Sequence, residues 1–204
     1  RHVIGRDEAW LISHPDQQLR ANEQEAYATL RARRAAGEPA AYLTGSREFF
    51  SLAFKVTPAV LIPRPETELL VETALERIPA DAPWRVLDLA TGSGCVAIAI
   101  ARQRPRAQVM ATDVSPAALA VARENAARHG VNIEFAESDW YAALSGRRFD
   151  LIVANPPYVA EGDPHLNAGD LRFEPRSALI AGSAGLDGIE AIVEQSPRHL
   201  AAGG

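Results

Sequence analysis

The residues best suited to chemistry follow an apolar run in the stretch FDLIVANPPYV (149–159). Pro156 and Pro157 have no N–H to donate and fix their own φ angles, and Pro156 also keeps Asn155 out of the helical region. We therefore predict a stiff loop that presents carbonyl acceptors and an amide side chain, with Tyr158 as an aromatic wall. Such a loop suits a ligand that carries N–H groups. The alternative is an ordinary turn, since Asn and Pro are common in turns.

A second candidate site is the glycine-containing turn within LDLATGSGCVAIA (87–99). Gly92 and Gly94 have no Cβ, so a ligand can approach the backbone closely. The helix predicted after the turn offers free N–H groups and a partial positive charge at its N-terminus. Asp113 ends the next predicted strand, where its carboxylate can accept hydrogen bonds from two ribose hydroxyls. The pattern predicts a cofactor that contains a nucleoside.

Two cofactors remain open on these residues. The run from Gly92 to Ala97 matches the dinucleotide pattern G-x-G-x-x-G/A, with Asp113 at about the expected spacing of ~20 residues. Asp88, just before the turn, favours a different ligand. Its carboxylate would oppose a pyrophosphate, whereas it could organise a cationic amino-acid group such as the methionine end of S-adenosylmethionine. The alternative role for Asp88 is to cap loop N–H groups.

The elements that must position these residues alternate regularly. We expect strands at 85–90, 107–113, 131–137 and 149–155, separated by helices, with a last helix over 186–200. This alternation predicts an α/β fold with a parallel sheet covered on both faces. Ligands of such sheets bind at the carboxyl ends of the strands, so Asn155 should lie beside the glycine turn.

The helix over 115–130 carries clear end signals. Ser115 is the predicted N-cap, Pro116 the first helical residue and Gly130 the stop. These signals fix the position of the helix that follows Asp113.

The N-terminal part has a different pattern. Residues 6–37 show helical periodicity, and we expect Asn22 to cap the second helix, with Glu25 three residues on and Gly37 at its end. The stretch 47–62 alternates and is rich in aromatic and β-branched residues, which predicts a hairpin.

A further helix is predicted over 64–78, with Pro65 near its first turn. Glu66 and Glu68 are interpreted as charges that complement its dipole. Its expected apolar face consists of Leu69, Leu70, Ala74, Leu75 and Ile78.

Composition excludes several classes of protein. The 204 residues suggest one domain, or one domain with a small appendage, and 47% apolar with 23% charged residues is ordinary globular composition. A net charge of −5 gives no general reason to hold nucleic acid. Cys95 is the only cysteine, which fits a reducing compartment. No apolar run approaches the roughly 18 residues of a membrane span, and the histidines match no metal-ligand spacing.

These motifs together resemble a known family. The runs DLATGSG and NPPY resemble class I S-adenosylmethionine methyltransferases that modify planar amide or amine nitrogens. Three further stretches, IPRPETELLVE (62–72), SDWY (138–141) and DLRFEPRSALIAGSAGLDGIEAI (170–192), narrow the resemblance to the release factor glutamine N5-methyltransferases, the PrmC/HemK family. The resemblance extends from about Trp10 onward.

The resemblance implies a domain arrangement. It places a helical N-terminal substrate-recognition domain at 1–46, a β-hairpin connector at 47–62 and a Rossmann-like methyltransferase domain at 63–204. Family members continue through three more strands, so the chain is expected to be a fragment. The family usually has glycine where Ala90 stands; a methyl group there should narrow the turn and leave its backbone contact intact.

The resemblance also implies roles for the two candidate sites, with S-adenosylmethionine as cofactor and no metal. The substrate would be the glutamine of the Gly-Gly-Gln loop in a class I peptide-chain release factor, with Asn155, Pro156 and Tyr158 as catalytic residues. Trp140 would lie by the adenine and Asp113 by the ribose. The full implied cofactor set is Asp88, Ala90, Thr91, Gly92, Ser93, Gly94, Asp113, Trp140 and Asn155, and the implied substrate set is Asn155, Pro156, Pro157 and Tyr158.

A cytoplasmic monomer that acts on release factors, without direct binding of nucleic acid or membrane, is the resulting expectation. Two other enzymes stay open. A DNA adenine-N6 methyltransferase uses the same Asn-Pro-Pro-Tyr logic but usually needs a basic cleft. A nicotinamide-dependent oxidoreductase explains Gly92 and Asp113 but leaves 155–158 without a role. A non-catalytic fragment is also possible, with an exposed sheet edge at 149–155.

Overall fold

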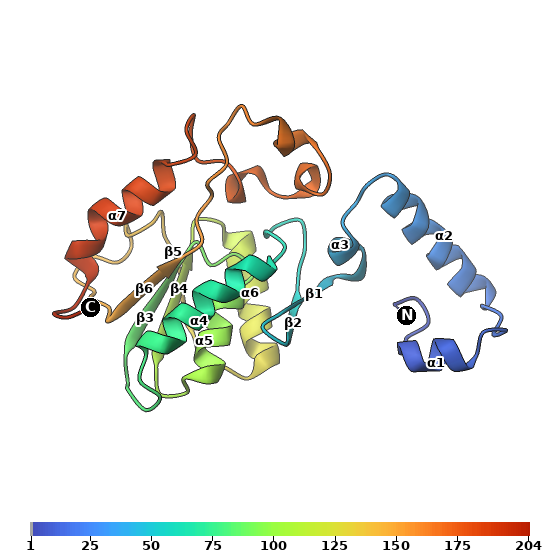
Figure 1. Cartoon of the computed structure of the whole chain (residues 1–204), viewed down its shortest axis with the longest axis horizontal. Coiled ribbons are helices and arrows are strands. Elements are labelled where there is room, and N and C mark those ends of the chain that lie inside the picture. The colour runs from blue at the N-terminus through green and yellow to red at the C-terminus, as the bar shows by residue number, and fades with distance from the viewer. Residues whose placement is uncertain (1) are drawn as a thin grey trace.

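The computed structural model describes residues 2–204, and within them four parallel strands form one sheet in the order β5-β4-β3-β6 (Figure 1). A helical segment and an antiparallel hairpin precede this sheet. They consist of α1 (Glu8–Ser13), α2 (Ala21–Ala35), α3 (Ala40–Thr44), β1 (Ser46–Phe49) and β2 (Leu52–Lys55). The sheet and its helices are α4 (Glu68–Arg77), β3 (Arg85–Leu89), α5 (Cys95–Gln103), β4 (Gln108–Asp113), α6 (Pro116–His129), β5 (Glu134–Glu137), β6 (Leu151–Ala154) and α7 (Asp187–His199). The expected α/β fold with a parallel sheet is confirmed.

The two faces of the sheet are covered by different elements because side chains alternate along each strand. On β3, Val86 packs into the layer formed with α4 and α5, whereas Leu87 packs with Tyr141 and Ile192 on the opposite face, where α7 lies. In Figure 1 the helices α4, α5 and α6 lie together on one side of the sheet and α7 on the other. The helices on the two faces leave the carboxyl ends of the strands uncovered.

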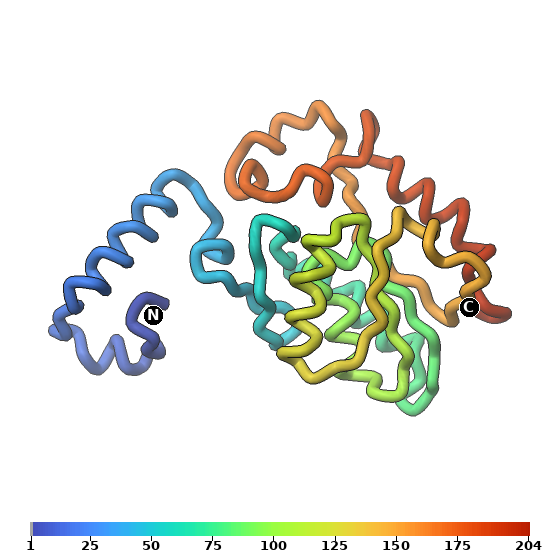
Figure 2. Tube along the Cα trace, turned by 180° about the vertical axis from the view of Figure 1, so that it is seen from behind, coloured from blue at the N-terminus to red at the C-terminus, as the bar shows by residue number. Residues whose placement is uncertain are grey.

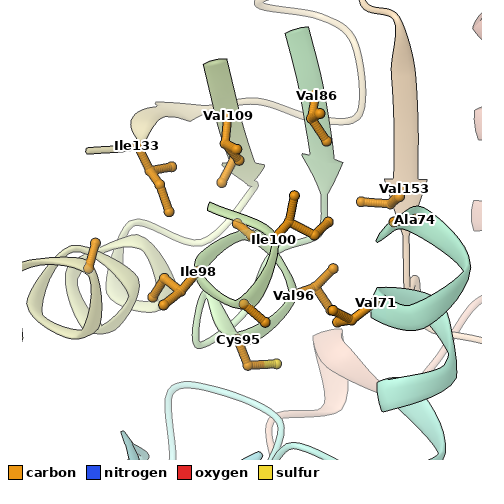
Figure 3. Close-up of a cluster of buried hydrophobic side chains, with 14 of the residues drawn as sticks. Val71, Ala74, Val86, Cys95, Val96, Ile98, Ile100, Val109, Ile133 and Val153 are labelled. Atoms are coloured by element: carbon orange, nitrogen blue, oxygen red, sulfur yellow. The ribbon is translucent and has the colours of Figure 1, made fainter. Parts of the chain in front are cut away.

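Helix α5 follows the glycine turn and is buried along its first six residues, Cys95 to Ile100. A helix that is apolar all round must be enclosed, and α5 is packed between the sheet, α4 and α6. Figure 3 shows Val96 directed toward α4 and Ile100 toward the strands. This enclosure holds the start of α5, and with it the glycine turn, in one position.

Helix α6 begins and ends as predicted. The Ser115 hydroxyl accepts from the Ala118 N–H, Pro116 is the first helical residue, and Gly130 adopts a left-handed conformation at the C-cap. The position of α6 directly after Asp113 is therefore encoded locally.

Helix α2 does not begin where expected. Arg20 is its N-cap, and Glu23, three residues on, accepts from the Arg20 backbone N–H at 2.8 Å. The prediction of Asn22 with Glu25 was wrong, because Asn22 already lies inside the helix. Arginine is an unusual N-cap residue, so no preference for this start was visible in the sequence.

The hairpin predicted over 47–62 forms, but it is shorter and starts one residue earlier, over 46–55. Its two-residue turn is Phe50–Ser51, both with positive φ. Residues with side chains are uncommon in that region. The remaining residues, 56–62, run as a turn and extended segment toward α4.

Helix α4 is preceded by a 3₁₀ turn, η1 (Pro65–Thr67). In α4 the side chains of Val71 and Ala74 are buried, as is that of Ile78 at its C-cap, whereas Leu69 is 66% exposed. The prediction that Leu69 belongs to the apolar face was wrong, because Leu69 lies two positions, about 200° around the helix, from Val71 at the centre of that face.

The segment 160–182 forms a large loop after β6. It leaves and returns through a parallel bridge between Val159 and Ile180, and it contains short 3₁₀ turns. Figure 2 shows this loop reaching toward the N-terminal segment. There the Arg172 guanidinium donates to the Ala36 carbonyl, and Arg34 lies 3.5 Å from Asp170.

Strand β6 forms one edge of the sheet, where an edge was expected at 149–155. Phe149, just before β6, pairs with Leu200, which follows α7. Among residues 2–204, no helix is long and apolar enough to cross a membrane.

Candidate functional site

A pocket of about 360 Å³ lies at the carboxyl ends of β3, β4 and β6; we call it the strand-end pocket. Its walls come from the glycine turn, the start of α6, the extended segment before α4, the segment after β5 (138–140), the loop after β6 (155–157), and the chain that runs from the 160–182 loop into α7. Its position agrees with the general location of ligands in open parallel sheets.

Most residues of the predicted site line this pocket. They are Asp88, Ala90, Thr91, Gly92, Ser93, Asp113, Trp140, Asn155 and Pro157. The pocket thus brings the glycine turn and the Asn-Pro-Pro-Tyr loop together, although more than 60 positions separate them in the sequence.

Three predicted residues lie outside the lining. A Cβ at Gly94 would come within 3.1 Å of Ala122 on α6, so Gly94 serves close packing of helices. Pro156 packs beside Gly188 near the Trp140 ring. Tyr158 has a side chain that is 62% exposed, beside rather than inside the pocket.

The glycine turn is held in a strained backbone conformation. Ala90 and Gly92 have φ values of +56° and +55°, and the Thr91 N–H donates to the Thr112 carbonyl at 2.9 Å. A Cβ placed at Gly92 would meet no atom within 4 Å, so the backbone there faces open space. Ala90 carries its methyl group in a region that costs about 1–2 kcal/mol for residues other than glycine. A glycine at position 90 would adopt this conformation without that cost.

Asp113 ties the glycine turn to α6. One carboxylate oxygen accepts from the Gly92 N–H at 2.9 Å and the other from the Ser115 N–H at 2.9 Å. Each carboxylate oxygen keeps a second lone pair. Asp113 can therefore accept hydrogen bonds from two hydroxyl groups of a ligand while the backbone N–H groups hold it in place.

Asp88 is a buried carboxyl group at the bottom of the pocket. It accepts from the Thr91 hydroxyl at 2.6 Å. Burial raises the pKa of Asp88 to about 7, and the nearby Asp113 charge adds to this effect, whereas hydrogen bonds from Thr91 and Ala97 act in the opposite direction. A carboxyl group in this state is ready to ionise when a cation binds next to it.

The charges around the pocket favour a cationic ligand. The lining carboxylates are Asp88, Asp113, Asp139 and Asp187, and within the described residues the lining contains one basic side chain, Arg64. Arg64 is paired with Glu174. A pyrophosphate would be repelled by this arrangement, whereas a sulfonium with an ammonium group would be attracted. The pocket therefore fits S-adenosylmethionine better than a nicotinamide dinucleotide.

Asn155 lies at the rim of the pocket with its amide oriented by a neighbour. Its Nδ2 donates to the Thr67 hydroxyl at 3.4 Å. Among residues 2–204, no group donates to Asn155 Oδ1 or to the Pro156 carbonyl oxygen. Two acceptors therefore remain available where the loop meets the pocket.

The structure adds residues that motif reasoning did not assign to the site. Arg64 and Thr67 line the pocket from the segment before α4. Glu174 contacts that segment at Ile62 and Arg64. The Glu174 side chain is fully buried; it accepts from the Ile62 N–H at 2.9 Å and from the Arg64 guanidinium. Arg64, Thr67 and Glu174 belong to the stretches RPETE and FEPR, which contribute to the family resemblance. The sequence alone did not indicate that the two stretches contact each other.

Comparisons with known proteins agree with this geometry. Residues 65–174 match the family model described as Methyltransferase small domain, and residues 1–45 match the PrmC N-terminal domain. Relatives named release factor glutamine methyltransferase include those of Xylella fastidiosa, 53% identical, and Burkholderia pseudomallei, 55% identical; the whole chain aligns with 74% of the length of each. The Escherichia coli relative of the same name is 47% identical, with 100% of this chain and 73% of that protein covered.

Solved structures show the same fold. A ribosomal protein L11 methylase from Lactobacillus delbrueckii is 27% identical, with a TM-score of 0.50, and covers 69% of this chain and 58% of its own. A Thermus thermophilus 16S rRNA methyltransferase, solved with S-adenosylmethionine and guanosine, has a TM-score of 0.58 at 24% identity, covering 76% of this chain and 38% of its own. The second likeness supports the fold alone.

Proposed function

Because this chain belongs to the release factor glutamine methyltransferase family, we propose that it methylates the side-chain amide nitrogen of a glutamine in a peptide-chain release factor. The methyl donor is S-adenosylmethionine. The glutamine is that of the Gly-Gly-Gln loop of class I release factors.

One observation carries the proposal: Asn155 Oδ1 and the Pro156 carbonyl oxygen, both without a donor in the described part of the chain, stand beside a pocket suited to S-adenosylmethionine. A primary amide has two N–H groups in one plane. Two neighbouring acceptors, one from a side chain and one from the backbone, match that pair.

The residues of the loop account for transfer to a weak nucleophile. When bound, S-adenosylmethionine supplies a methyl group already activated on a sulfonium sulfur. The amide nitrogen becomes positively charged as it accepts the methyl group, so its hydrogen bonds to Asn155 and Pro156 strengthen in the transition state. Tyr158 packs on the amide plane, and the displaced proton leaves to water.

No protein nucleophile is required by this route. Cys95, the one thiol of the chain, lines the pocket, and burial raises its pKa to about 12. It therefore stays protonated at neutral pH and acts as a small apolar residue.

The cofactor would be held by the residues that line the other side. Asp88 accepts the ammonium group of the methionine part, and the turn from Ala90 to Gly94 contacts it through the backbone. Asp113 accepts the ribose hydroxyls and Trp140 packs by the adenine. The support for these roles is the burial and charge of Asp88, the open backbone at Gly92 and the free lone pairs of Asp113.

The N-terminal domain, residues 1–46, would recognise the release factor. The match of residues 1–45 to the PrmC N-terminal domain supports a separate unit for this role. We place the reaction in the cytoplasm, where translation ends, and expect a monomer that does not bind nucleic acid directly.

Methyl transfer to two acceptors tests this function. The protein is incubated with tritiated S-adenosylmethionine and either an intact class I release factor or adenine-containing DNA. Label is expected in the release factor and not in the DNA. Label in the DNA alone would replace the proposal with an adenine methyltransferase.

A further inference from the structure

We propose that Thr67 is a positioning residue for the transfer: its hydroxyl holds the Asn155 amide so that Oδ1, and not Nδ2, faces the glutamine nitrogen. The inference rests on the proposed function, because it assigns the orientation of the group that receives the substrate amide.

The need for such a residue follows from the chemistry of the asparagine side chain. Its terminal torsion has two nearly equivalent states, and rotation between them exchanges an acceptor for two donors. A glutamine amide presents N–H groups, so the rotated Asn155 would meet them with its own N–H groups. In this structure the Thr67 hydroxyl accepts from Asn155 Nδ2 at 3.4 Å, which is the productive state, and it leaves Asn155 Oδ1 without a donor in the described part of the chain.

Thr67 is itself fixed from both sides. Its backbone N–H donates to the Arg64 carbonyl at 3.0 Å, and the Arg64 guanidinium is held by the buried Glu174. On the other side, a carboxylate oxygen of Glu68 accepts from the Phe50 N–H at 2.8 Å. The backbone that carries the Thr67 side chain is therefore held in place, through Arg64 by the 160–182 loop and through Glu68 by the hairpin.

Substitution of Thr67 separates this role from packing. Thr67→Val keeps the volume and removes the hydroxyl, and we expect kcat to fall about tenfold, a smaller loss than deletion of a direct transition-state contact. The affinity for S-adenosylhomocysteine and the KM for S-adenosylmethionine should stay within twofold of the wild type. Thr67→Ser should restore most of the turnover, because it restores the hydroxyl.

Thr73 on α4, the helix that follows Thr67, offers a matched control. Its hydroxyl donates to the Leu69 carbonyl at 2.8 Å and does not line the pocket, so Thr73→Val should leave kcat unchanged. If Thr67→Val does not fold, Thr67→Ala provides the same loss of the hydroxyl without the branched side chain.

A double-mutant cycle distinguishes positioning from an independent effect. In an Asn155→Ala background there is no amide to orient, so Thr67→Val should cause no further loss of the residual turnover. An equal tenfold loss in both backgrounds, or wild-type kcat in Thr67→Val, would overturn the inference while leaving the proposed function intact. Wild-type protein that transfers no methyl group to a release factor would overturn both.

Discussion

At the scale of single residues, Asp113 and Asn155 line the same pocket but should serve different steps. Asp113 is fixed by backbone N–H groups on the cofactor side, whereas Asn155 stands at the rim with a free acceptor. Their substitutions should therefore have opposite signatures.

We expect Asn155→Ala to bind S-adenosylhomocysteine with near wild-type affinity and to lose at least about 100-fold in turnover, the usual size for removal of a transition-state hydrogen bond. Asp113→Ala should instead weaken cofactor binding by about tenfold or more, since it loses both ribose contacts. Calorimetry and a transfer assay measure the two effects. Near wild-type turnover in Asn155→Ala would refute its role.

Asp88 should make the stability of the folded protein depend on pH. Its folded pKa of about 7 lies above its ordinary value of 3.8, so the folded state holds a proton that the unfolded state has released between these values. Stability therefore falls as pH rises through that window and levels off above about pH 7. The destabilisation caused by the buried, ionised Asp88 carboxylate is fully present at about pH 8 and absent below about pH 4.

Asp88→Asn removes this cost, and the variant should be more stable than the parent at about pH 8, by up to about 4 kcal/mol, because one pKa unit corresponds to about 1.4 kcal/mol. At about pH 5 the gain should be smaller. The same variant should bind S-adenosylhomocysteine more weakly, since the ammonium loses its partner. Urea unfolding at the two pH values tests the sign; an equal gain at both would refute the assignment.

At the scale of elements, one buried amide joins the hairpin to the glycine turn. Asn125 on α6 is 0% exposed; its Oδ1 accepts from the Lys55 N–H at 2.8 Å, and its Nδ2 donates to the carbonyls of Lys55 and Ser93 at 3.0 and 2.9 Å. This single side chain fixes the distance between β2 and the cofactor turn.

Asn125→Ala leaves those three backbone groups without a partner, so we expect a loss of about 2–3 kcal/mol in the free energy of unfolding. Cofactor affinity should fall as well, because Ser93 belongs to the turn. Asn132 is exposed, and Asn132→Ala should change stability by less than about 0.5 kcal/mol. Chemical denaturation of the two variants makes the comparison, and equal stabilities would contradict the clamp.

Elements with local signals were predictable from the sequence. Ser115, Pro116 and Gly130 define α6 by capping alone, and the glycine turn is defined by residues that follow one another. The Phe50–Ser51 turn was not predictable in detail, because neither residue favours a positive φ. A contact of the turn is distant in sequence: the Phe50 N–H donates to the Glu68 carboxylate, 18 positions away, at 2.8 Å.

At the scale of the whole molecule, the 160–182 loop joins parts that the sequence keeps apart. Arg172 contacts the C-terminal end of α2, Glu174 holds Ile62 and Arg64, and the bridge from Val159 to Ile180 returns the chain to the pocket. The contacts of Arg172 and Glu174 join residues more than 100 positions apart, so periodicity and capping do not reveal them. Thr67 was missed for the same reason: its role depends on Asn155, which lies 88 positions away.

The whole arrangement also decides between cofactors, which the glycine turn alone left open. Asp139 and Asp187 come from two different connections of the sheet and add their charge to Asp88 and Asp113 in one pocket. Only the folded chain gathers these carboxylates. Motif matching at 92–97 is compatible with a dinucleotide, whereas the carboxylates of the assembled pocket favour S-adenosylmethionine.

The most direct test of the account is to locate the transferred methyl group. The protein is incubated with S-adenosylmethionine and an intact class I release factor, which is then digested and mapped by mass spectrometry. We expect the peptide with the Gly-Gly-Gln loop to gain the mass of one CH₂ group, with fragment ions that place it on the glutamine side chain, and we expect no gain with Asn155→Ala. A methyl group on another residue, or an unmodified peptide with active-site residues intact and cofactor bound, would contradict the account.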